Sequence, residues 1–107
     1  SSGMLKNHYS PKKDLIVGEI KSLIKKYINK KIGVLSFNKY YEDVNLKNQI
    51  ILSKNHNLEQ ASRNLYKSLH LLDNMNVDLI LTSLLPNHGI GKSINDRIIK
   101  ASKKNGL

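Results

Sequence analysis

Four histidines are the side chains of this sequence best suited to metal binding near neutral pH, so their spacing comes first. They stand at His8, His56, His70 and His88. No two of them lie four residues apart on a predicted helix, and none has a nearby carboxylate partner, whereas zinc ligands need converging positions. The sequence also has no cysteine, which excludes thiolate ligands and disulfides. We therefore predict no metal site.

Nucleophilic and acid–base catalysis have no pattern to support them either. No serine lies in a Gly-x-Ser-x-Gly elbow, the turn that exposes a catalytic serine. The eight acidic residues include no pair whose spacing singles out an acid and a base. We expect this chain to carry no catalytic residues of its own.

A glycine pair lies where a predicted strand passes into a predicted helix. Gly89 and Gly91 flank Ile90, and free N–H groups at a helix start can hold an anion. The dinucleotide fingerprint is incomplete because position 94 is Ile, and the Walker A pattern is incomplete because position 86 is Pro. Two interpretations stay open: an anion-binding turn, or a tight turn in which small residues permit close packing.

Three polar residues follow in the first turns of the same helix. Asp96 suits the positive end of the helix dipole. Arg97, beside it, could pair with a carboxylate on a neighbouring element or chain. Asn95, Asp96 and Arg97 therefore join the glycines as a possible anion-binding or domain-contact motif. The alternative is ordinary helix-surface electrostatics, which contributes little.

The densest group of functional side chains lies in a segment without periodicity. Residues 1–13 have no helical or strand pattern, and they contain His8, Tyr9, Ser10 and Pro11. Ser10 precedes a proline and is expected to be extended. Such a polar and aromatic set is best explained by an arm that docks on another surface.

Composition limits the classes of function. The chain has 107 residues, 39% of them hydrophobic, and a net charge of +10. This charge comes from 16 lysines and only two arginines, so a general lysine bias explains it, although contact with tRNA or another polyanion stays open. No apolar run approaches the roughly 20 residues that span a bilayer, and no signal peptide is recognisable, so we expect a cytoplasmic protein without membrane contact.

Hydrophobic periodicity predicts strands that alternate with helices. The expected strands cover residues 15–17, 32–37, 49–52 and 77–81. The first helix starts at Glu19 with an apolar stripe reaching Ile28, the second starts at Leu58 behind an Asn57 cap, and the last follows the glycine pair. This alternation predicts an α/β fold, a Rossmann-like three-layer sandwich with a small, mostly parallel sheet flanked by helices. We predict a linker arm at 1–13 and one domain at 14–107.

Three segments resemble a known family in order and spacing. Residues 3–11 (GMLKNHYSP) resemble the linker of the two-domain threonylcarbamoyl-AMP synthases, the long YrdC-type proteins. Residues 61–73 (ASRNLYKSLHLLD) resemble a helix of their carboxy-terminal domain, and residues 86–101 (PNHGIGKSINDRIIKA) resemble its closing segment. The sequence is therefore similar to the carboxy-terminal accessory domain of that family together with its interdomain linker.

The resemblance implies a role in tRNA modification. The whole enzyme is a nucleotidyltransferase that condenses L-threonine, bicarbonate and ATP into threonylcarbamoyl-adenylate and pyrophosphate. Catalysis, ATP and Mg²⁺ belong to a YrdC-like domain of the same polypeptide, which would be the partner of this chain. By the same resemblance, Lys6, His8, Tyr9 and Pro11 belong to a lid over the nucleotide and threonine pocket.

Two departures from the family pattern concern small residues. Ser2 stands where many relatives have proline, and Ser93 replaces a common alanine. The likeness of Ser1 and Gly3 to the linker indicates a native segment, although a tag would have the same letters. Without its catalytic partner, we expect the arm to be mobile or to be ordered by a neighbouring molecule, and self-association is one way to supply that neighbour.

Overall fold

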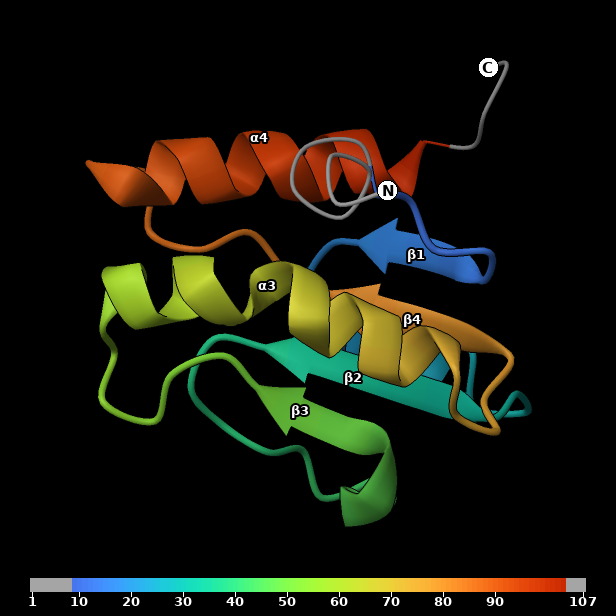
Figure 1. Cartoon of the computed structure of the whole chain (residues 1–107). Helices are drawn as coiled ribbons and strands as arrows, with labels where there is room; N and C mark the ends of the chain where they lie inside the picture. The colour runs from blue at the N-terminus through green and yellow to red at the C-terminus, as the bar shows by residue number, and fades with distance from the viewer. Residues whose placement is uncertain (1–8, 104–107) are drawn as a thin grey trace.

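The computed structural model describes residues 9–103, and within that range strands and helices alternate (Figure 1). The strands are β1 (Asp14–Val17), β2 (Ile32–Ser36), β3 (Gln49–Ile51) and β4 (Leu79–Thr82). The α-helices are α2 (Ile20–Lys26), α3 (Leu58–Asp73) and α4 (Ile90–Ser102), and a short 3₁₀ helix, η1, covers Leu46–Asn48.

The four strands form one parallel sheet in the order β1-β4-β2-β3. In its registers, Leu81 of β4 lies opposite Ile16 of β1 on one side and Val34 of β2 on the other, while Leu35 of β2 lies opposite Ile50. The two central strands, β2 and β4, are buried along their whole length. Burial on both faces explains why these strands read as continuous apolar runs rather than alternating ones. The predicted α/β class with a small parallel sheet is confirmed.

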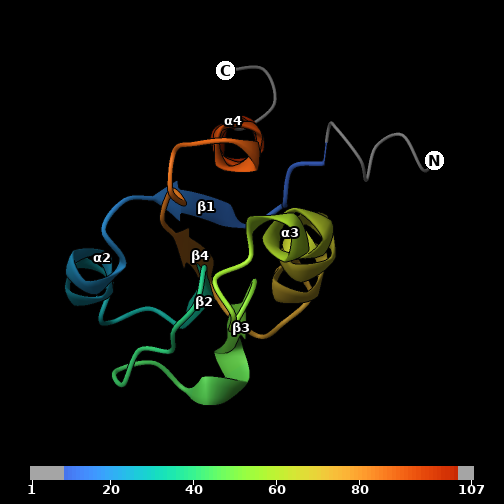
Figure 2. The same cartoon turned by 90° about the vertical axis from the view of Figure 1, so that its left-hand side faces the viewer.

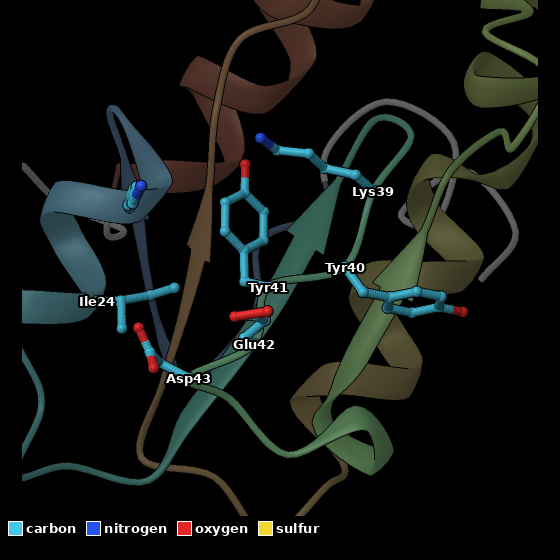
Figure 3. A pocket seen from close by; sticks show the side chains of 7 residues that line it. Ile24, Lys39, Tyr40, Tyr41, Glu42 and Asp43 are labelled. Atoms are coloured by element: carbon cyan, nitrogen blue, oxygen red, sulfur yellow. The ribbon is translucent and has the colours of Figure 1, made fainter.

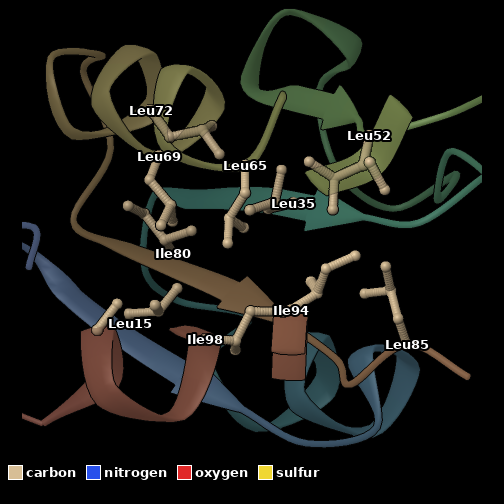
Figure 4. Close-up of a cluster of buried hydrophobic side chains, with 12 residues drawn as sticks. Leu15, Leu35, Leu52, Leu65, Leu69, Leu72, Ile80, Leu85, Ile94 and Ile98 are labelled. Atoms are coloured by element: carbon tan, nitrogen blue, oxygen red, sulfur yellow. The ribbon is translucent and has the colours of Figure 1, made fainter. Parts of the chain in front are cut away.

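Two apolar clusters separate the molecule into three layers (Figure 2). On one face, α3 and α4 pack over Leu35 and Ile80; Figure 4 shows this cluster, with Leu65, Leu69, Ile94 and Ile98 supplied by the two helices. On the other face, α2 packs through Ile20 and Ile24 against Val34, Leu79 and Leu81. The alternation of Leu79, Ile80 and Leu81 between the two clusters is the period of two that a strand imposes.

Helix boundaries follow local capping, with one correction. The predicted cap at Asn57 is confirmed, because its side chain accepts a hydrogen bond of 2.8 Å from the Gln60 N–H. Helix α2, however, ends at Lys26 with Tyr27 as its cap, and Ile28 is 57% exposed. The apolar stripe extended to Ile28 was therefore wrong, since the chain has left the helix before that residue. Of the two isoleucines considered for the core side of α4, Ile94 is buried and Ile90 is exposed.

None of the helices within residues 9–103 has the length and apolar character required to cross a bilayer.

Candidate functional site

The carboxylate of Asp73, the last residue of α3, binds the arm that leads into β1. The hydroxyl of Tyr9 and the main-chain N–H of Lys12 each donate to Oδ2 at 3.0 Å. The main-chain N–H of Lys13 donates to Oδ1, also at 3.0 Å, and the Lys13 ammonium donates to the Asp73 carbonyl. We call this set of four residues, Tyr9, Lys12, Lys13 and Asp73, the Asp73 clasp.

The electrostatics of the clasp favour an ionised carboxylate. Partial burial alone would raise the pKa of Asp73, but the hydrogen bonds from the Lys13 and Lys12 main chain and from the Tyr9 hydroxyl outweigh it, so the pKa lies below its ordinary value. Burial, together with the hydrogen bond to Asp73, raises the pKa of the Tyr9 phenol. Tyr9 is therefore a neutral donor to a charged acceptor, which is a strong class of hydrogen bond.

Other contacts fix the arm between the ends of two helices. The Tyr9 ring packs edge-on against Tyr66, with centroids 6.4 Å apart, and against His70 at 6.1 Å. The Ser10 hydroxyl donates to the carbonyl of Ala101 in α4 at 2.9 Å, and Pro11 is buried. Residues 9–13, which we call the arm root, thus join α3 to α4 before the first strand begins.

These contacts correct one expectation for residues 9–13, the part of the arm that the structure describes. A mobile arm, or one ordered by a neighbouring molecule, was expected, yet the arm root is bound to its own domain. The reason is that Asp73 offers a carboxylate whose oxygens accept three converging donors. Lys6 and His8 lie outside the described residues, and the predicted lid role of Tyr9 and Pro11 stays a prediction.

The glycine turn before α4 has a steric cause at Gly91. A Cβ added to Gly91 would lie 1.9 Å from the carbonyl oxygen of Pro86, so a side chain does not fit without moving the backbone. Gly89 caps the helix with φ of 55° and ψ of −132°, in the left-handed range of φ that favours glycine. The N–H groups of Gly91 and Lys92 donate to the carbonyls of His88 and Gly89. This geometry supports the close-packing interpretation, while the anion-binding one stays a prediction.

The three polar residues of α4 point to three different surroundings. Buried Asn95 accepts from the Leu85 N–H at 2.8 Å and donates to the Leu85 carbonyl at 2.9 Å, which fixes the connection from β4. Asp96 forms an exposed ion pair with Lys100 at 3.1 Å. Arg97 reaches α3, where its guanidinium donates to the Ser62 hydroxyl at 3.2 Å. The structure therefore does not bring these residues together at one point.

A cleft of about 210 Å³ lies between α2 and the loop that follows β2 (Figure 3). Its lining carries both charge signs, from Lys21 and Lys39 and from Glu42 and Asp43. The buried amide of Gln49 holds the loop through the main chain of Tyr41 and Val44, at 2.7 to 2.8 Å. No sequence motif indicated this cleft.

A second hollow, of about 330 Å³, lies on the outer side of α3 and is almost wholly apolar. Its lining comes from Tyr66, Lys67, His70 and Leu71, of which Leu71 is 49% exposed. Because Tyr66 and His70 also touch the ring of Tyr9, this hollow adjoins the arm root.

Asp73 is the residue whose role sequence reasoning missed. It stands at the last position of α3, where the negative end of the helix dipole disfavours a carboxylate. An acidic residue at the last position of a long helix was the available signal that it has partners elsewhere. For metals, no group of three or more His, Asp or Glu side chains converges within residues 9–103.

The fold and the arm root together define a small parallel α/β domain that is entered through an anchored linker-like segment. The chain belongs to the family described as threonylcarbamoyl-AMP synthase, C-terminal domain, whose sequence model matches residues 1–103. It is 32% identical over 111 residues to the threonylcarbamoyl-AMP synthase of Pyrococcus abyssi, which covers 94% of this chain. The family predicted from the three sequence segments is thereby confirmed.

Solved structures of the same archaeal protein have the same fold. The crystal structure of P. abyssi Sua5 complexed with L-threonine matches 90% of this chain with a TM-score of 0.72 and 32% identity. A P. abyssi Sua5 variant, in which an adjacent histidine and tyrosine are both replaced by alanine, matches 83% with a TM-score of 0.64 and 30% identity. This chain spans only 31% of the length of the P. abyssi synthase, and 30% and 29% of the two crystallised chains.

Proposed function

We propose that this chain is the accessory domain of an L-threonylcarbamoyladenylate synthase and that its arm covers the active site of a YrdC-like catalytic domain. The observation that carries the proposal is the family match over residues 1–103, which includes the arm as well as the domain. In this proposal the two-domain protein converts L-threonine, bicarbonate and ATP to threonylcarbamoyl-adenylate and pyrophosphate, for tRNA modification in the cytoplasm. ATP and Mg²⁺ bind in the catalytic domain.

A pair of neighbouring residues supports the lid. The sequence contains one adjacent histidine and tyrosine, His8 and Tyr9, and an adjacent histidine and tyrosine are the residues replaced in the crystallised P. abyssi variant. In the proposed lid, Lys6 lies near phosphate, while His8 and Tyr9 face the nucleotide and threonine. For Tyr9 this closure requires its hydroxyl to leave Asp73. Pro11 stiffens the arm behind them.

The work of such a lid is physical rather than covalent. Closing a segment over a reactive adenylate excludes water and limits hydrolysis of the intermediate. The domain supplies the rigid base on which the arm closes. This role requires no catalytic group within residues 14–107, and it makes the isolated chain inactive.

The test compares this chain with a two-domain protein in which it follows a YrdC-like catalytic domain. Pyrophosphate release is measured with L-threonine, bicarbonate and ATP, and each substrate is omitted in turn. We expect turnover by the two-domain protein, none by the 107-residue chain, and a strong loss when His8 and Tyr9 are both replaced by alanine. Robust turnover by the isolated chain would refute the proposal.

A second candidate, an RNA-binding or nucleotide-binding module, is favoured by one observation. Five lysines, at positions 21, 25, 26, 30 and 31, lie on α2 and just beyond it; all are exposed, and residues 20–31 contain no acidic residue. Titration of tRNA at several salt concentrations decides it, because each neutralised phosphate contributes about −0.7 to −0.9 to the slope of log K against log salt. A slope near zero eliminates the RNA-binding candidate. Nucleotide titration tests separately whether the turn at Gly89 and Gly91 binds a nucleotide.

A further inference from the structure

We propose that the cleft between α2 and the loop after β2 binds a small amino acid in its zwitterionic form. In this proposal Lys21 and Lys39 take the carboxylate of the ligand, and Glu42 and Asp43 take its ammonium group. The inference does not depend on the proposed function, because α2 covers the face of the sheet opposite to α3 and α4, which hold the arm root.

The cleft begins at the edge of the sheet where parallel α/β domains bind ligands. Strands β1 and β4 are neighbours, yet the chain leaves β1 into α2 on one face and leaves β4 into α4 on the other (Figure 2). Ligands of such sheets bind outside the carboxyl ends of the strands, at the point where the connections part in this way. Lys21 lies in the first turn of α2 and Lys39 lies three residues after the end of β2, so both belong to this edge.

The charged side chains of the cleft are equal in number and are not paired with one another. Two lysines and two carboxylates line the cleft, and all four side chains are exposed. Within residues 9–103, ion pairing is found between Asp96 and Lys100 on α4, so no ion pair inside the cleft competes with a ligand. The ammonium of Lys39 lies over the ring of Tyr41, 5.0 Å from its centroid, which restricts where the ammonium points.

The carboxylate of Glu19 favours a zwitterion over a phosphate. It caps α2 by accepting from the N–H groups of Lys21 and Ser22, at 3.2 and 3.1 Å, so the start of the helix already holds an anion. Its charge also reaches the cleft, because burial and then the charge of Glu19 raise the pKa of the Tyr41 phenol. A phosphate would face three carboxylates and two lysines, whereas a zwitterion brings no net charge to the cleft.

The loop at 39–43, which carries most of the lining, is held on both sides. The Ser36 hydroxyl donates to the Lys39 carbonyl at the end of β2. The buried amide of Gln49 accepts from the Tyr41 N–H and donates to the Tyr41 carbonyl, both at 2.8 Å. Because the loop is already ordered, a ligand does not have to supply the free energy of ordering it.

The size of the cleft fits a molecule as small as an amino acid. Its volume of about 210 Å³ is below the roughly 300 to 1,000 Å³ of sites for drug-sized molecules. Figure 3 shows the Lys39 ammonium and the Tyr41 hydroxyl toward one end of the cleft and the Asp43 carboxylate toward the other. The buried side chain of Ile24 adds an apolar wall that suits a short side chain.

The experiment is an NMR titration of the 107-residue chain with L-alanine, L-threonine and two analogues of alanine that each lack one charged group. Propionate keeps the carboxylate, and ethylamine keeps the ammonium group. Because ion pairs with exposed side chains are weak, we expect a Kd of about 1 to 10 mM for both amino acids and binding about tenfold weaker for each analogue. The chemical-shift changes should be centred on the main-chain amides of Lys21 and of residues 39–43.

Two variants and two matched controls locate the ligand. Lys39→Met and Asp43→Asn each remove one charge from the cleft, and each should weaken L-alanine binding about fivefold. Lys100→Met and Asp96→Asn remove the same kinds of charge from the exposed ion pair on α4, and they should leave the affinity unchanged.

Every other outcome overturns the inference. Equal affinity for L-alanine and propionate means a simple anion site, and equal affinity for L-alanine and ethylamine means a simple cation site. A lack of saturable shifts up to about 100 mM of either amino acid means that the cleft binds no amino acid. Binding that Lys39→Met and Asp43→Asn leave unchanged means that the ligand lies elsewhere. All these outcomes leave the proposed function as it stands, since the titration involves no catalytic domain.

Discussion

In each of two connections of this domain, one side chain binds two main-chain groups, and the two side chains differ in charge and burial. The arm root, residues 9–13, is bound by the half-buried carboxylate of Asp73. The connection from β4 to α4 is bound by the neutral amide of Asn95, which is 5% exposed, and by the close approach of Gly91 to Pro86. Both side chains satisfy main-chain groups outside a regular element.

The difference predicts that the connection from β4 to α4 costs more free energy to break than the arm root does. Main-chain groups paired inside the protein have no water to replace a lost partner, so breaking the Asn95 bonds has a high cost. The donors of the arm root lie near solvent, where water can take the place of Asp73 at a smaller cost. The proposed lid requires this difference, because only the arm would change its contacts on closing.

The largest expected effect is at Gly91. Gly91→Ala places a Cβ 1.9 Å from the Pro86 carbonyl, and relieving such overpacking costs at least about 3 kcal/mol. Gly89→Ala is the control, because no atom lies within 4 Å of its added Cβ and only the positive φ opposes it, at about 1 to 3 kcal/mol. Urea unfolding of both variants measures the difference. A Gly91→Ala protein as stable as Gly89→Ala would show that the turn shifts freely and is not fixed.

The next effect is at Asn95. Asn95→Ala leaves the N–H and the carbonyl of buried Leu85 unpaired, and at about 1 to 3 kcal/mol for each group we expect a loss of roughly 2 to 4 kcal/mol. Asn87→Ala removes only an exposed side chain that makes a contact of 3.5 Å with Asn95, and it should be close to neutral. Thermal unfolding of Asn95→Ala and Asn87→Ala measures the difference in stability between the two variants. Equal midpoints would mean that water already satisfies Leu85.

Much of this fold follows from sequence patterns that have one physical cause. Apolar runs predicted strands at all four observed positions because both faces of the sheet are covered. Asn57 was recognised as a cap because its side chain imitates the missing helical acceptor. The end of α2 was predicted beyond its true position, since Ile28 continues the apolar spacing but lies outside the helix, with Tyr27 as the cap.

The candidate site was less predictable because its partners are far apart in sequence. Asp73 and Lys12 are separated by 61 residues, and neither has a pattern that identifies the other. For Arg97, pairing with a carboxylate on a neighbouring element or chain was one possibility, and its observed partner is the hydroxyl of Ser62 in α3. Asn95, grouped with its neighbours as a possible anion-binding or domain-contact motif, binds the connection before its own helix, a role that no sequence pattern indicated.

A smaller effect should appear on acidification and distinguish the two connections. Because the folded-state pKa of Asp73 lies below its ordinary value of 3.8, the clasp contributes stability above that value and loses it as pH falls through the folded-state pKa. Above pH 3.8 the free energy of unfolding of the wild type should exceed that of Asp73→Asn by about 1 kcal/mol. Below that pH the difference between the two proteins should disappear.

Urea unfolding at a series of pH values measures this gap, with Asn95→Ala as the contrasting case. The loss of unfolding free energy caused by Asn95→Ala should not depend on pH, because an amide does not titrate. A gap between the wild type and Asp73→Asn that is unchanged down to the lowest pH would show that the shape of Asp73, rather than its charge, holds the arm root.

The smallest effect is expected at Asp96, and it tests whether charge alone explains the clasp. Asp96 pairs with Lys100 at 3.1 Å, but the two side chains are 63% and 70% exposed, so Asp96→Asn should cost less than about 0.5 kcal/mol, and less still at high salt. Asp73 differs by receiving three converging donors, two of them from the main chain. If unfolding experiments give Asp96→Asn the same cost as Asp73→Asn, the convergence of donors adds nothing, and the arm root is held no better than an ordinary surface ion pair.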